Sequence, residues 1–508
     1  MSRANNAIFP LLVAAALGVG ACGGAGKTTV AVPGTASKTA PPAPPSTSAA
    51  DSLGPRPEPK PPVPFVPPAP QVLEGPGNSK VWLLERHALP LVTIALVVPY
   101  GSAAEPADKG GLAFASADML DEGAGDRDAL AFSKAINDLG AKLSSAADRD
   151  SSIVSLEVLV SKLDQALPLL ADAVVRPRHA NKDWTRVRTL WQNALKNRAH
   201  EPNEVARVVT SAVYYGAQHP YAHPPDGTLT SAKKVQLGDI SKWHKTIWRP
   251  DAATFVVVGD VKPDAIGASL KKAFAAWKVP AAAQPPVVTP GPASESNLRT
   301  FVVDRADAPQ VVMSFARSGP PASDAVFPRL NMLNLALGGS FTSRLNQNLR
   351  EDRGWTYGVR SRFNSQRGAG MFVVRAALRA DATAPALRET KKEIDKMRAE
   401  GLAAPEIDKV RALLNGEALE TYGTLHGVAG SLASNAALGL PPDQDAKDLA
   451  SQRSATPKDL ATLASSYLDV SSVTLVLVGP KETAIKALAD SGLPKPELVD
   501  AEGRSVAH

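Results

Sequence analysis

Cysteine, aromatic residues and a strong net charge are all scarce in this chain. One of its 508 residues is cysteine, which excludes an intrachain disulfide, and only 5% are aromatic. The 56 basic and 50 acidic residues give a net charge of +6, and no dense Lys/Arg run is interleaved with aromatic residues. Binding to nucleic acid therefore has little support. The first apolar run, residues 8–19, is too short for a lasting membrane span.

The N-terminus has the features of an export signal. Arg3 precedes the apolar run, and V19-G-A-C22 follows it. This tetrapeptide resembles the lipobox of bacterial lipoproteins, in which the cysteine receives the lipid. Residues 1–22 are predicted to be a signal peptide with Cys22 as the lipidated residue, although a chance cysteine is the alternative. Gly23 instead of Asp favours the outer membrane facing the periplasm, so we expect a lipid-anchored protein of the bacterial cell envelope.

A proline-rich stretch follows the signal. Between Pro41 and Pro70, 13 of 30 residues are proline. Such a segment buries too little apolar surface to fold and is typical of an extended spacer. We therefore predict a tether over residues 23–76. A ligand for modules with aromatic grooves is the less favoured interpretation.

The rest of the chain repeats itself after about 220 residues. Residues 253–259 read ATFVVVG and residues 473–479 read VTLVLVG, and a helical pattern follows each (265–274 and 483–491). Near the start of each half, a strand leads through a Gly turn into a helix. These strand and helix pairs are 91–100 with 111–120, and 311–317 with 328–337. Further amphipathic helices are predicted at 129–139, 164–175 and 184–197.

Strands and helices mix within each half, which predicts two homologous α+β domains in tandem. Each is expected to be a mostly antiparallel sheet with helices on one face. The predicted divisions are a signal peptide (1–22), a tether (23–76), an N-terminal domain (77–280), a proline-rich linker (281–295), a C-terminal domain (296–495) and a tail (496–508).

Several segments resemble the pitrilysin/insulinase family of zinc metallopeptidases. They are G101-S-A-A-E-P-A-D-K-G-G-L-A113, H219-P-Y-A-H223, R249-P-D-A-A-T-F-V-V-V-G-D260, L337-G-G-S-F-T-S-R-L345 and L349-R-E-D-R-G-W-T-Y-G-V359. The resemblance covers roughly residues 76–490. It is to the short two-domain branch that includes mitochondrial processing peptidases, and it implies domains of the LuxS/metallohydrolase-like fold.

The resemblance also shows where zinc chemistry has been lost. Active family members carry H-x-x-E-H on a helix and a distal glutamate. The matching positions here are Phe114, Ala117 and Asp118, and the distal ligand falls on Ala194, 76 residues after Asp118. A phenyl ring cannot ligate zinc, and a methyl group cannot act as a general base. The chain is therefore predicted to bind no metal or other cofactor and to be inactive alone.

The remaining histidines do not suggest a replacement site. His219 and His223 are four residues apart, but Pro220 and Pro224 forbid a regular helix that would place them on one face. The resemblance implies a loop in which they order the backbone. Five other histidines are isolated in sequence and are interpreted as surface or core residues; they are His87, His179, His200, His244 and His426.

Two residues of the C-terminal half do match functional residues of the family. In the family, an arginine and a tyrosine seven residues apart bind and polarise the substrate carbonyl beside zinc, and Arg350 and Tyr357 match them. A guanidinium offers permanent charge with forked donors, and a phenol can donate to a developing oxyanion. The plainer alternative is a solvated helix charge and a strand-edge aromatic residue.

The favoured function is a non-catalytic, substrate-binding subunit of a heteromeric zinc endopeptidase of the envelope. Its expected partners are a homologous subunit that carries the zinc, unfolded peptide substrate and the membrane through the lipid anchor. One alternative is a peptide-binding or scaffolding lipoprotein with no proteolytic role. An autonomous metalloendopeptidase with an unrecognised site is the least favoured.

Overall fold

The computed structural model describes residues 63–293 and 297–506 of the chain. The chain divides into two compact units, residues 1–64 and 65–508. Every helix and strand in the described ranges lies in the second unit. The predicted signal peptide with Cys22 lies outside these ranges. Within them, no helix combines the length and apolar character that crossing a bilayer requires.

The first half of the second unit is built on a six-stranded sheet of strand order β1-β2-β8-β3-β7-β6. Its strands are β1 (Gln71–Glu74), β2 (Lys80–Glu85), β3 (Leu91–Val98), β6 (Lys142–Ala147), β7 (Ser152–Leu159) and β8 (Thr254–Gly259). β2 and β8 run parallel, and the other neighbouring pairs are antiparallel. β3 reads LVTIALVV and is almost wholly buried, as its β-branched residues and central position favour.

The helices of this half are α1 (Leu112–Asp118), α2 (Ala129–Asp138), α3 (Leu163–Val175), α4 (Asn181–Arg198), α5 (Pro202–Tyr215), α6 (Leu229–Ala232), α7 (Leu237–Ile247) and α8 (Pro263–Ala273). Helices α1, α2, α3, α4 and α8 match the predicted patterns within a few residues, whereas α5, α6 and α7 were not predicted. A short ribbon of β4 (Gly123–Ala124) and β5 (Arg127–Asp128) precedes α2. The side chain of Asp128 accepts a hydrogen bond from the Ala131 amide (2.9 Å), which fixes the start of α2.

The second half repeats this architecture. Its six-stranded sheet has the order β11-β12-β10-β13-β9-β14. Its strands are β9 (Arg299–Asp304), β10 (Gln310–Ser318), β11 (Thr356–Phe363), β12 (Met371–Arg379), β13 (Thr474–Gly479) and β14 (Glu497–Leu498). Its helices are α9 (Phe327–Asn334), α10 (Arg344–Asn346), α11 (Thr383–Glu400), α12 (Ala404–Tyr422), α13 (Leu425–Leu438), α14 (Gln444–Ser454), α15 (Pro457–Tyr467) and α16 (Lys481–Asp490). Two π-helical segments, Leu335–Gly339 and Gln347–Asp352, follow α9 and α10.

The two sheets share one topology. Strands β2, β8, β3, β7 and β6 correspond in order to β9, β13, β10, β12 and β11. Among these five strands, each sheet has one parallel pair, β2 with β8 and β9 with β13, in which Val81 is opposite Phe255 and Phe301 is opposite Val476. The prediction of two homologous α+β domains with mostly antiparallel sheets is therefore confirmed.

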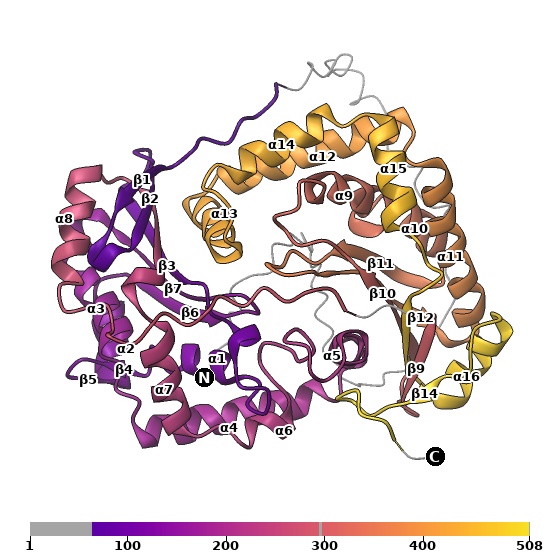
Figure 1. Cartoon of the computed structure of the whole chain (residues 1–508), viewed down its shortest axis with the longest axis horizontal. Helices are drawn as coiled ribbons and strands as arrows, with labels where there is room; N and C mark the ends of the chain where they lie inside the picture. Colours follow the sequence, from indigo (N-terminus) through magenta and orange to yellow (C-terminus); the bar gives the residue numbers. More distant parts are fainter. Residues whose placement is uncertain (1–62, 294–296, 507–508) are drawn as a thin grey trace, which may run out of the picture. The chain divides into compact units, whose positions relative to one another are not determined.

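Each sheet buries one face under helices of its own half. In the first half, Ile94 and Leu156 of the sheet share a core with Leu167 of α3 and Leu270 of α8. The second core is built in the same way. Figure 1 shows α11, α15 and α16 beside the strands of the second sheet.

The other face of each sheet is covered by a helix of the opposite half. Val428 and Leu432 of α13 are fully buried in one cluster with Val256 of the first sheet. Reciprocally, Val209 of α5 is fully buried in one cluster with Val476 of the second sheet. Figure 1 shows α13 near the strands of the first half and α5 near those of the second. The expectation of helices on one face only is therefore incomplete, because the two halves exchange helices.

A buried polar network also joins the halves. Asp150, in the turn after β6, accepts hydrogen bonds from the Tyr221 hydroxyl (2.7 Å) and from the Arg367 amide (2.9 Å). The Arg367 guanidinium donates to the carbonyl oxygens of Pro99 (3.0 Å) and Asp150 (2.9 Å). Burial raises the pKa of Asp150, and these hydrogen bonds oppose that effect. Arg367 thus provides hydrogen bonds to buried backbone carbonyl groups of the first half that water cannot reach.

Two predicted boundaries differ from the structure. The tether expected over 23–76 includes β1, which pairs antiparallel with β2 after a turn in which Gly77 and Asn78 have positive φ. The tail expected over 496–508 includes β14, which pairs with β9, and Val499 is buried beside it. The described part of the predicted linker, 281–293, contains no helix or strand. Both corrections have one cause: a short segment becomes a strand when a sheet edge is available to pair with it.

Candidate functional site

Helix α1 presents the positions that would carry zinc. It begins after Gly111, whose φ is 92°. A Cβ at Gly111 would lie 2.5 Å from the indole of Trp191, so only glycine fits this close approach. Leu112, Ala113 and Ala115 are buried and fix the helix to the first core.

The four predicted ligand and base positions contain one polar side chain. Phe114 is partly buried, and its ring centroid lies 6.2 Å from that of Trp191. Ala117 is buried, whereas Asp118 and, on α4, Ala194 are exposed. A single carboxylate cannot complete the three or four ligands that zinc takes in proteins. These residues do not fit a zinc ion, and the described ranges hold no cluster of three His, Cys, Asp or Glu side chains able to bind a metal.

Asp118 is the carboxylate that remains. The protein packed around it reduces its solvation and raises its pKa to about 6, with a further contribution from the neighbouring Glu122 and opposition from Arg186. Arg186 forms its ion pair with Glu122. Asp118 has no ion-pair partner in the described ranges, so its negative charge at neutral pH is balanced only by the charge of Arg186, which is itself paired with Glu122.

The loop after α5 holds His219 and His223, as predicted. The His219 ring stacks on Tyr215, with centroids 4.4 Å apart, and its Nδ1 accepts a hydrogen bond from the Tyr221 amide (3.1 Å). Nδ1 of His223 lies 3.1 Å from the carbonyl oxygen of Pro224. Both rings therefore order this loop.

Two histidines that are isolated in sequence, His179 and His244, are core residues as one of the two interpretations had it, but they also lie together. The rings of His179 and His244 are 5.3 Å apart and nearly perpendicular. Burial lowers the pKa of His179 to about 4, and burial together with the charge of His179 lowers that of His244 to about 3. Both rings are neutral at physiological pH and serve as core groups. Because 65 residues separate the two histidines, no local sequence pattern predicts this contact.

In the second half, Arg350 lies on the π-helical segment Gln347–Asp352. Its guanidinium carbon is 4.1 Å from the centroid of the Phe341 ring, which is 68% exposed. Its Nη1 lies 3.1 Å from Oε1 of Glu351. Stacking on an aromatic face holds the guanidinium in place without consuming its hydrogen-bond donors. Phe341 is a site residue that the sequence analysis missed.

Tyr357 lies at the start of β11, the edge strand of the second sheet. Its side chain is 92% exposed and forms no hydrogen bond with the described residues. The pairing of β11 with β12 is irregular between Thr356 and Val359. A turn closed by a bond from the Gly354 amide to the Arg350 carbonyl (3.0 Å) connects the two predicted site residues. The structure therefore places Arg350 and Tyr357 on adjoining surface elements.

A buried asparagine supports both residues. The Asn346 amide nitrogen donates to the carbonyl oxygens of Ser340 (3.0 Å) and Val359 (3.0 Å), and its oxygen accepts from the Val359 amide (2.8 Å). Asn346 thus joins the loop that carries Phe341 to the strand that carries Tyr357. A Cβ on Gly338 would lie 2.7 Å from Oγ of Ser361, so glycine lets this turn approach β11. In the sequence, the position of Asn346 between the apolar residues Leu345 and Leu349 was the signal that could have predicted this buried supporting role.

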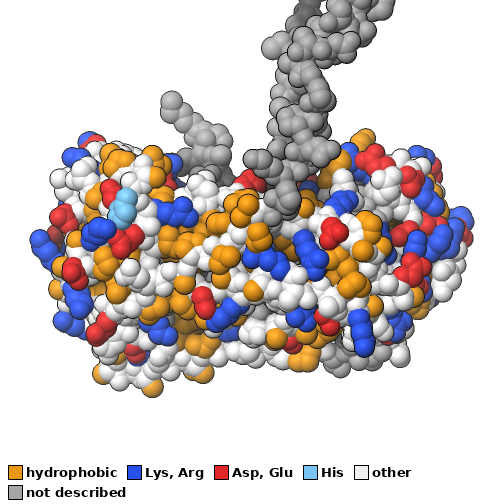
Figure 2. Space-filling view, turned by 90° about the horizontal axis from the view of Figure 1, so that it is seen from above, with side chains coloured by type: hydrophobic (Ala, Val, Ile, Leu, Met, Phe, Trp, Pro, Cys, Tyr) orange, Lys and Arg blue, Asp and Glu red, His pale blue; other side chains and the backbone are white. Residues whose placement is uncertain are grey.

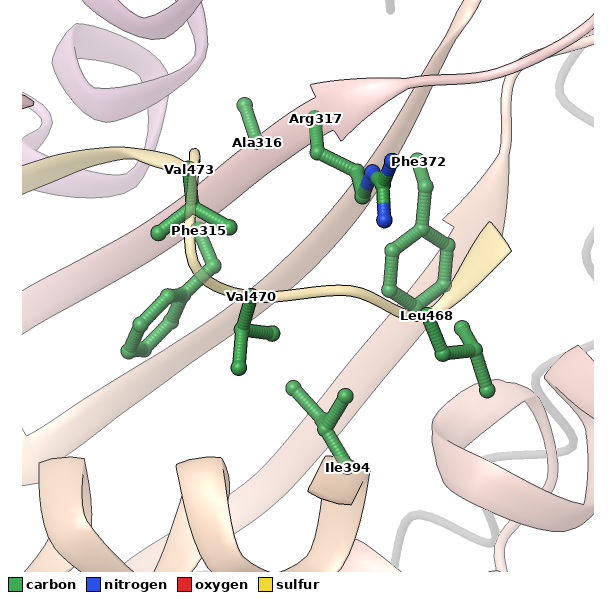
Figure 3. Close-up of a pocket in the computed structure, with 8 residues that line it drawn as sticks. All are labelled: Phe315, Ala316, Arg317, Phe372, Ile394, Leu468, Val470 and Val473. Atoms are coloured by element: carbon green, nitrogen blue, oxygen red, sulfur yellow. The ribbon is translucent and has the colours of Figure 1, made fainter. Parts of the chain in front are cut away.

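A polar pocket of about 520 Å³ lies beside this site, between α10, the π-helical segment, α11 and α12. Arg344 and Glu406 form a two-armed ion pair in its wall (2.7 and 2.6 Å). A second, apolar cavity of about 10 Å³ lies between the sheet and Ile394, Leu468 and Val470 (Figure 3). That volume is about one water molecule, so the cavity is a packing defect of the core and not a ligand site.

Comparison with known proteins identifies the family. The model of the M16 (insulinase) peptidases matches residues 80–222, and that of the peptidase M16 inactive domain matches residues 234–414. The chain belongs to the M16 peptidase family. The recognition made from its motifs is therefore confirmed.

Relatives of this M16 chain include proteins named as proteases and one named as inactive. A protein of Mycobacterium bovis named an uncharacterized zinc protease is 24% identical over 68% of the chain and 79% of the relative. The non-peptidase homolog YmxG of Helicobacter pylori is 22% identical over 78% of the chain and 91% of the relative.

Solved structures share the fold. The peptidase M16 inactive domain of Pseudomonas fluorescens superposes with a TM-score of 0.75 at 24% identity, over 81% of the chain and 98% of that structure. A protease of Helicobacter pylori gives a TM-score of 0.75 at 18% identity, over 82% of the chain and 100% of that structure. This M16 chain therefore has the fold of the family, and its relatives include both proteins named as proteases and one named as a non-peptidase homolog.

Proposed function

We propose that this M16 chain is a non-catalytic, substrate-binding subunit of a heteromeric zinc endopeptidase. In this role Arg350 and Tyr357 complete the active site of a homologous subunit that carries the zinc. The supporting observation is the contrast between the halves. The zinc positions on α1 and α4 hold one carboxylate, whereas the second half presents an exposed Tyr357 and, beside it, a partly buried Arg350.

The chemistry of these two side chains suits a site shared with a partner. A phenol hydroxyl without an internal hydrogen bond can donate to an oxyanion that forms on the substrate carbonyl. The guanidinium of Arg350 adds a fixed positive charge, and its contact with Phe341 preorganises it. Both effects grow when a partner surface excludes water from the site.

We also propose that Cys22 anchors the subunit by a lipid to the bacterial cell envelope and that its substrates are unfolded peptides. The relative of Helicobacter pylori that is named a non-peptidase homolog supports a non-catalytic role. The proposed substrate is an extended peptide, and the proposed partner is a chain with intact zinc ligands.

Purification of the full chain from its native membrane tests the proposal. We expect recovery of a second M16 chain with an intact H-x-x-E-H in equal amount. The mixture should cleave an unstructured peptide in a reaction that a chelator abolishes, and neither chain alone should do so.

Two other results would contradict the proposal. Chelator-sensitive cleavage by the purified chain alone would make it an autonomous peptidase. Recovery of the chain without an M16 partner, together with full biological activity after Arg350→Ala and Tyr357→Phe, would make it a peptide-binding or scaffolding lipoprotein.

A further inference from the structure

The outer strands of the second sheet carry arginines on the face away from their core. Phe372, Val374 and Ala376 of β12 point into the core of the second half. Side chains alternate along a strand, so Arg375 points to the opposite face. Arg360 of β11 is directly opposite Arg375 in the register and shares that face, as does Arg362 two residues further along.

Two arginines from the first half approach the same place. Arg207 projects from α5, the helix that covers this face, and Arg149 lies in the turn between β6 and β7. Burial lowers the pKa of Arg375 to about 10, and the charges of Arg362 and Arg207 contribute. Burial also lowers the pKa of Arg362, with Arg149 and Arg207 contributing. We call Arg149, Arg207, Arg360, Arg362 and Arg375 the arginine cluster.

The cluster has too few negative charges to balance it. Nε of Arg207 donates a hydrogen bond to Oε2 of Glu204 (2.9 Å), and Asp148 is the other nearby carboxylate. In the described ranges Arg360, Arg362 and Arg375 form no ion pair. The buried Nε atoms of Arg149 and Arg375 have no hydrogen-bond partner there. Like charges directly opposite in a sheet are destabilising, and buried donors without partners cost free energy.

Access to the cluster is open. Arg360 and Arg362 are exposed, and β11 is the edge strand of its sheet. Side chains two residues apart on one strand are separated by roughly 7 Å, and alternate side chains of an extended peptide have the same spacing. Guanidinium groups pair with carboxylates through two parallel hydrogen bonds.

We propose that the arginine cluster binds an acidic segment of an extended polypeptide, with carboxylates at alternate positions opposite Arg360 and Arg362. The choice of a polypeptide as the ligand rests on the proposed function. The inference that the ligand is an anion with several charges rests only on the unpaired positive charges of the arginine cluster.

Binding of labelled peptides to the full chain, without any partner, tests this assignment. One peptide carries Glu at every second position, and its matched control carries Gln there. We expect the acidic peptide to bind at least tenfold more tightly at low salt, with the difference shrinking as salt rises because exposed charges are screened. Equal affinity for the two peptides would overturn the proposal.

Variants locate the site. Arg360→Gln with Arg362→Gln should lower the affinity for the acidic peptide at least tenfold, whereas Arg379→Gln should not. Arg379 is an exposed arginine of β12 that pairs with Asp381 outside the cluster (2.6 Å). An unchanged affinity in the double variant would overturn the proposal. A short single-stranded oligothymidylate that binds more tightly than the acidic peptide would overturn the choice of a polypeptide.

Stability provides an independent readout. The double variant removes repulsion, so its melting temperature should equal or exceed that of the parent chain while its affinity falls. A lower melting temperature with unchanged affinity would mean that the arginines serve the fold alone. Because no partner is present, this result is separate from the proteolysis test: binding can hold even if no zinc-bearing subunit is found.

Discussion

The two halves of this M16 chain share a topology but differ at the surfaces where chemistry would occur. On α1, Phe114 packs against Trp191 and closes the zinc position with apolar contacts. In the second half, Arg350 stacks on an exposed Phe341, and Tyr357 extends into solvent. The buried residues of both halves still specify the same sheet. The same core can therefore support two surfaces whose exposed and half-buried side chains differ in chemistry.

The largest expected effect concerns the second half. In the reconstituted complex, Arg350→Ala or Tyr357→Phe should lower kcat by about 10²–10³-fold, the usual cost of losing one donor to an oxyanion. Tyr357 is exposed, so Tyr357→Phe should change stability by less than about 0.5 kcal/mol, whereas Arg350→Ala also removes the contact with Phe341 and should cost about 1 kcal/mol. Peptide cleavage and thermal melting measure the two quantities. Arg379→Ala is the matched control, and an equal loss of activity there would show a general charge effect.

The next effect concerns the contact between the halves. Asp150→Ala should lower the free energy of unfolding by about 3 kcal/mol, because it leaves the buried Arg367 and Tyr221 donors without their acceptor. Denaturant titration measures the change. Asp138→Ala, which removes an exposed partner of Lys134 on α2, should cost less than about 0.5 kcal/mol. Similar losses in both variants would mean that the Asp150 network does not hold the halves together.

A third change weakens the scaffold under the Arg350 and Tyr357 site. Asn346→Ala should destabilise the chain by about 2 kcal/mol, since buried backbone groups of Ser340 and Val359 lose their partner. It should also lower kcat of the reconstituted complex, because Phe341 and Tyr357 are no longer held together. The zinc content of the partner should stay constant. A destabilised chain with unchanged kcat would assign Asn346 to the fold alone.

The smallest effect concerns Asp118 in the first half. Its folded pKa of about 6 lies above the ordinary value of 3.8, so the native state binds the proton more tightly than the unfolded chain does. Its contribution to stability is therefore greatest below pH 4 and is lost as the pH rises through 6. Because the side chain is exposed, we expect Asp118→Asn to stabilise the chain by only about 1 kcal/mol at pH 7.5.

The pH dependence provides the check on Asp118. The gain from Asp118→Asn should vanish near pH 4, where the parent carboxyl is protonated in the native state, and urea unfolding at both pH values measures it. Asp138→Asn is the control. A gain of the same size at both pH values would mean that ionisation of Asp118 is not the cause.

Much of the fold was accessible from the sequence because its signals are local. The runs at 253–259 and 473–479 predicted β8 and β13, and the amphipathic patterns predicted α2, α3 and α4 within a few residues. The loss of zinc ligands on α1 could be found by matching motif positions. Each of these inferences depends on neighbours in the chain or on a short motif.

The missed features depend on which elements meet in space. The alternating arginines of β11 and the lone arginine in the apolar run of β12 were visible, but their alignment depends on strand register. The pairing of His179 with His244 joins α7 to a residue before α4. Helices α5 and α13 each cover the sheet of the opposite half. Their apolar faces predict that they are buried, but not which sheet they pack against. On the face that Figure 2 shows, Lys and Arg side chains lie among Asp and Glu side chains.

Because α5 and α13 each pack on the sheet of the opposite half, each half buries apolar surface of the other. A protease that cleaves the chain once within 281–293 should therefore yield two fragments that stay associated, because separating them would expose Val428 and Leu432 on one side and Val209 on the other. The two halves, although each has its own sheet, are therefore expected to behave as one unit of stability.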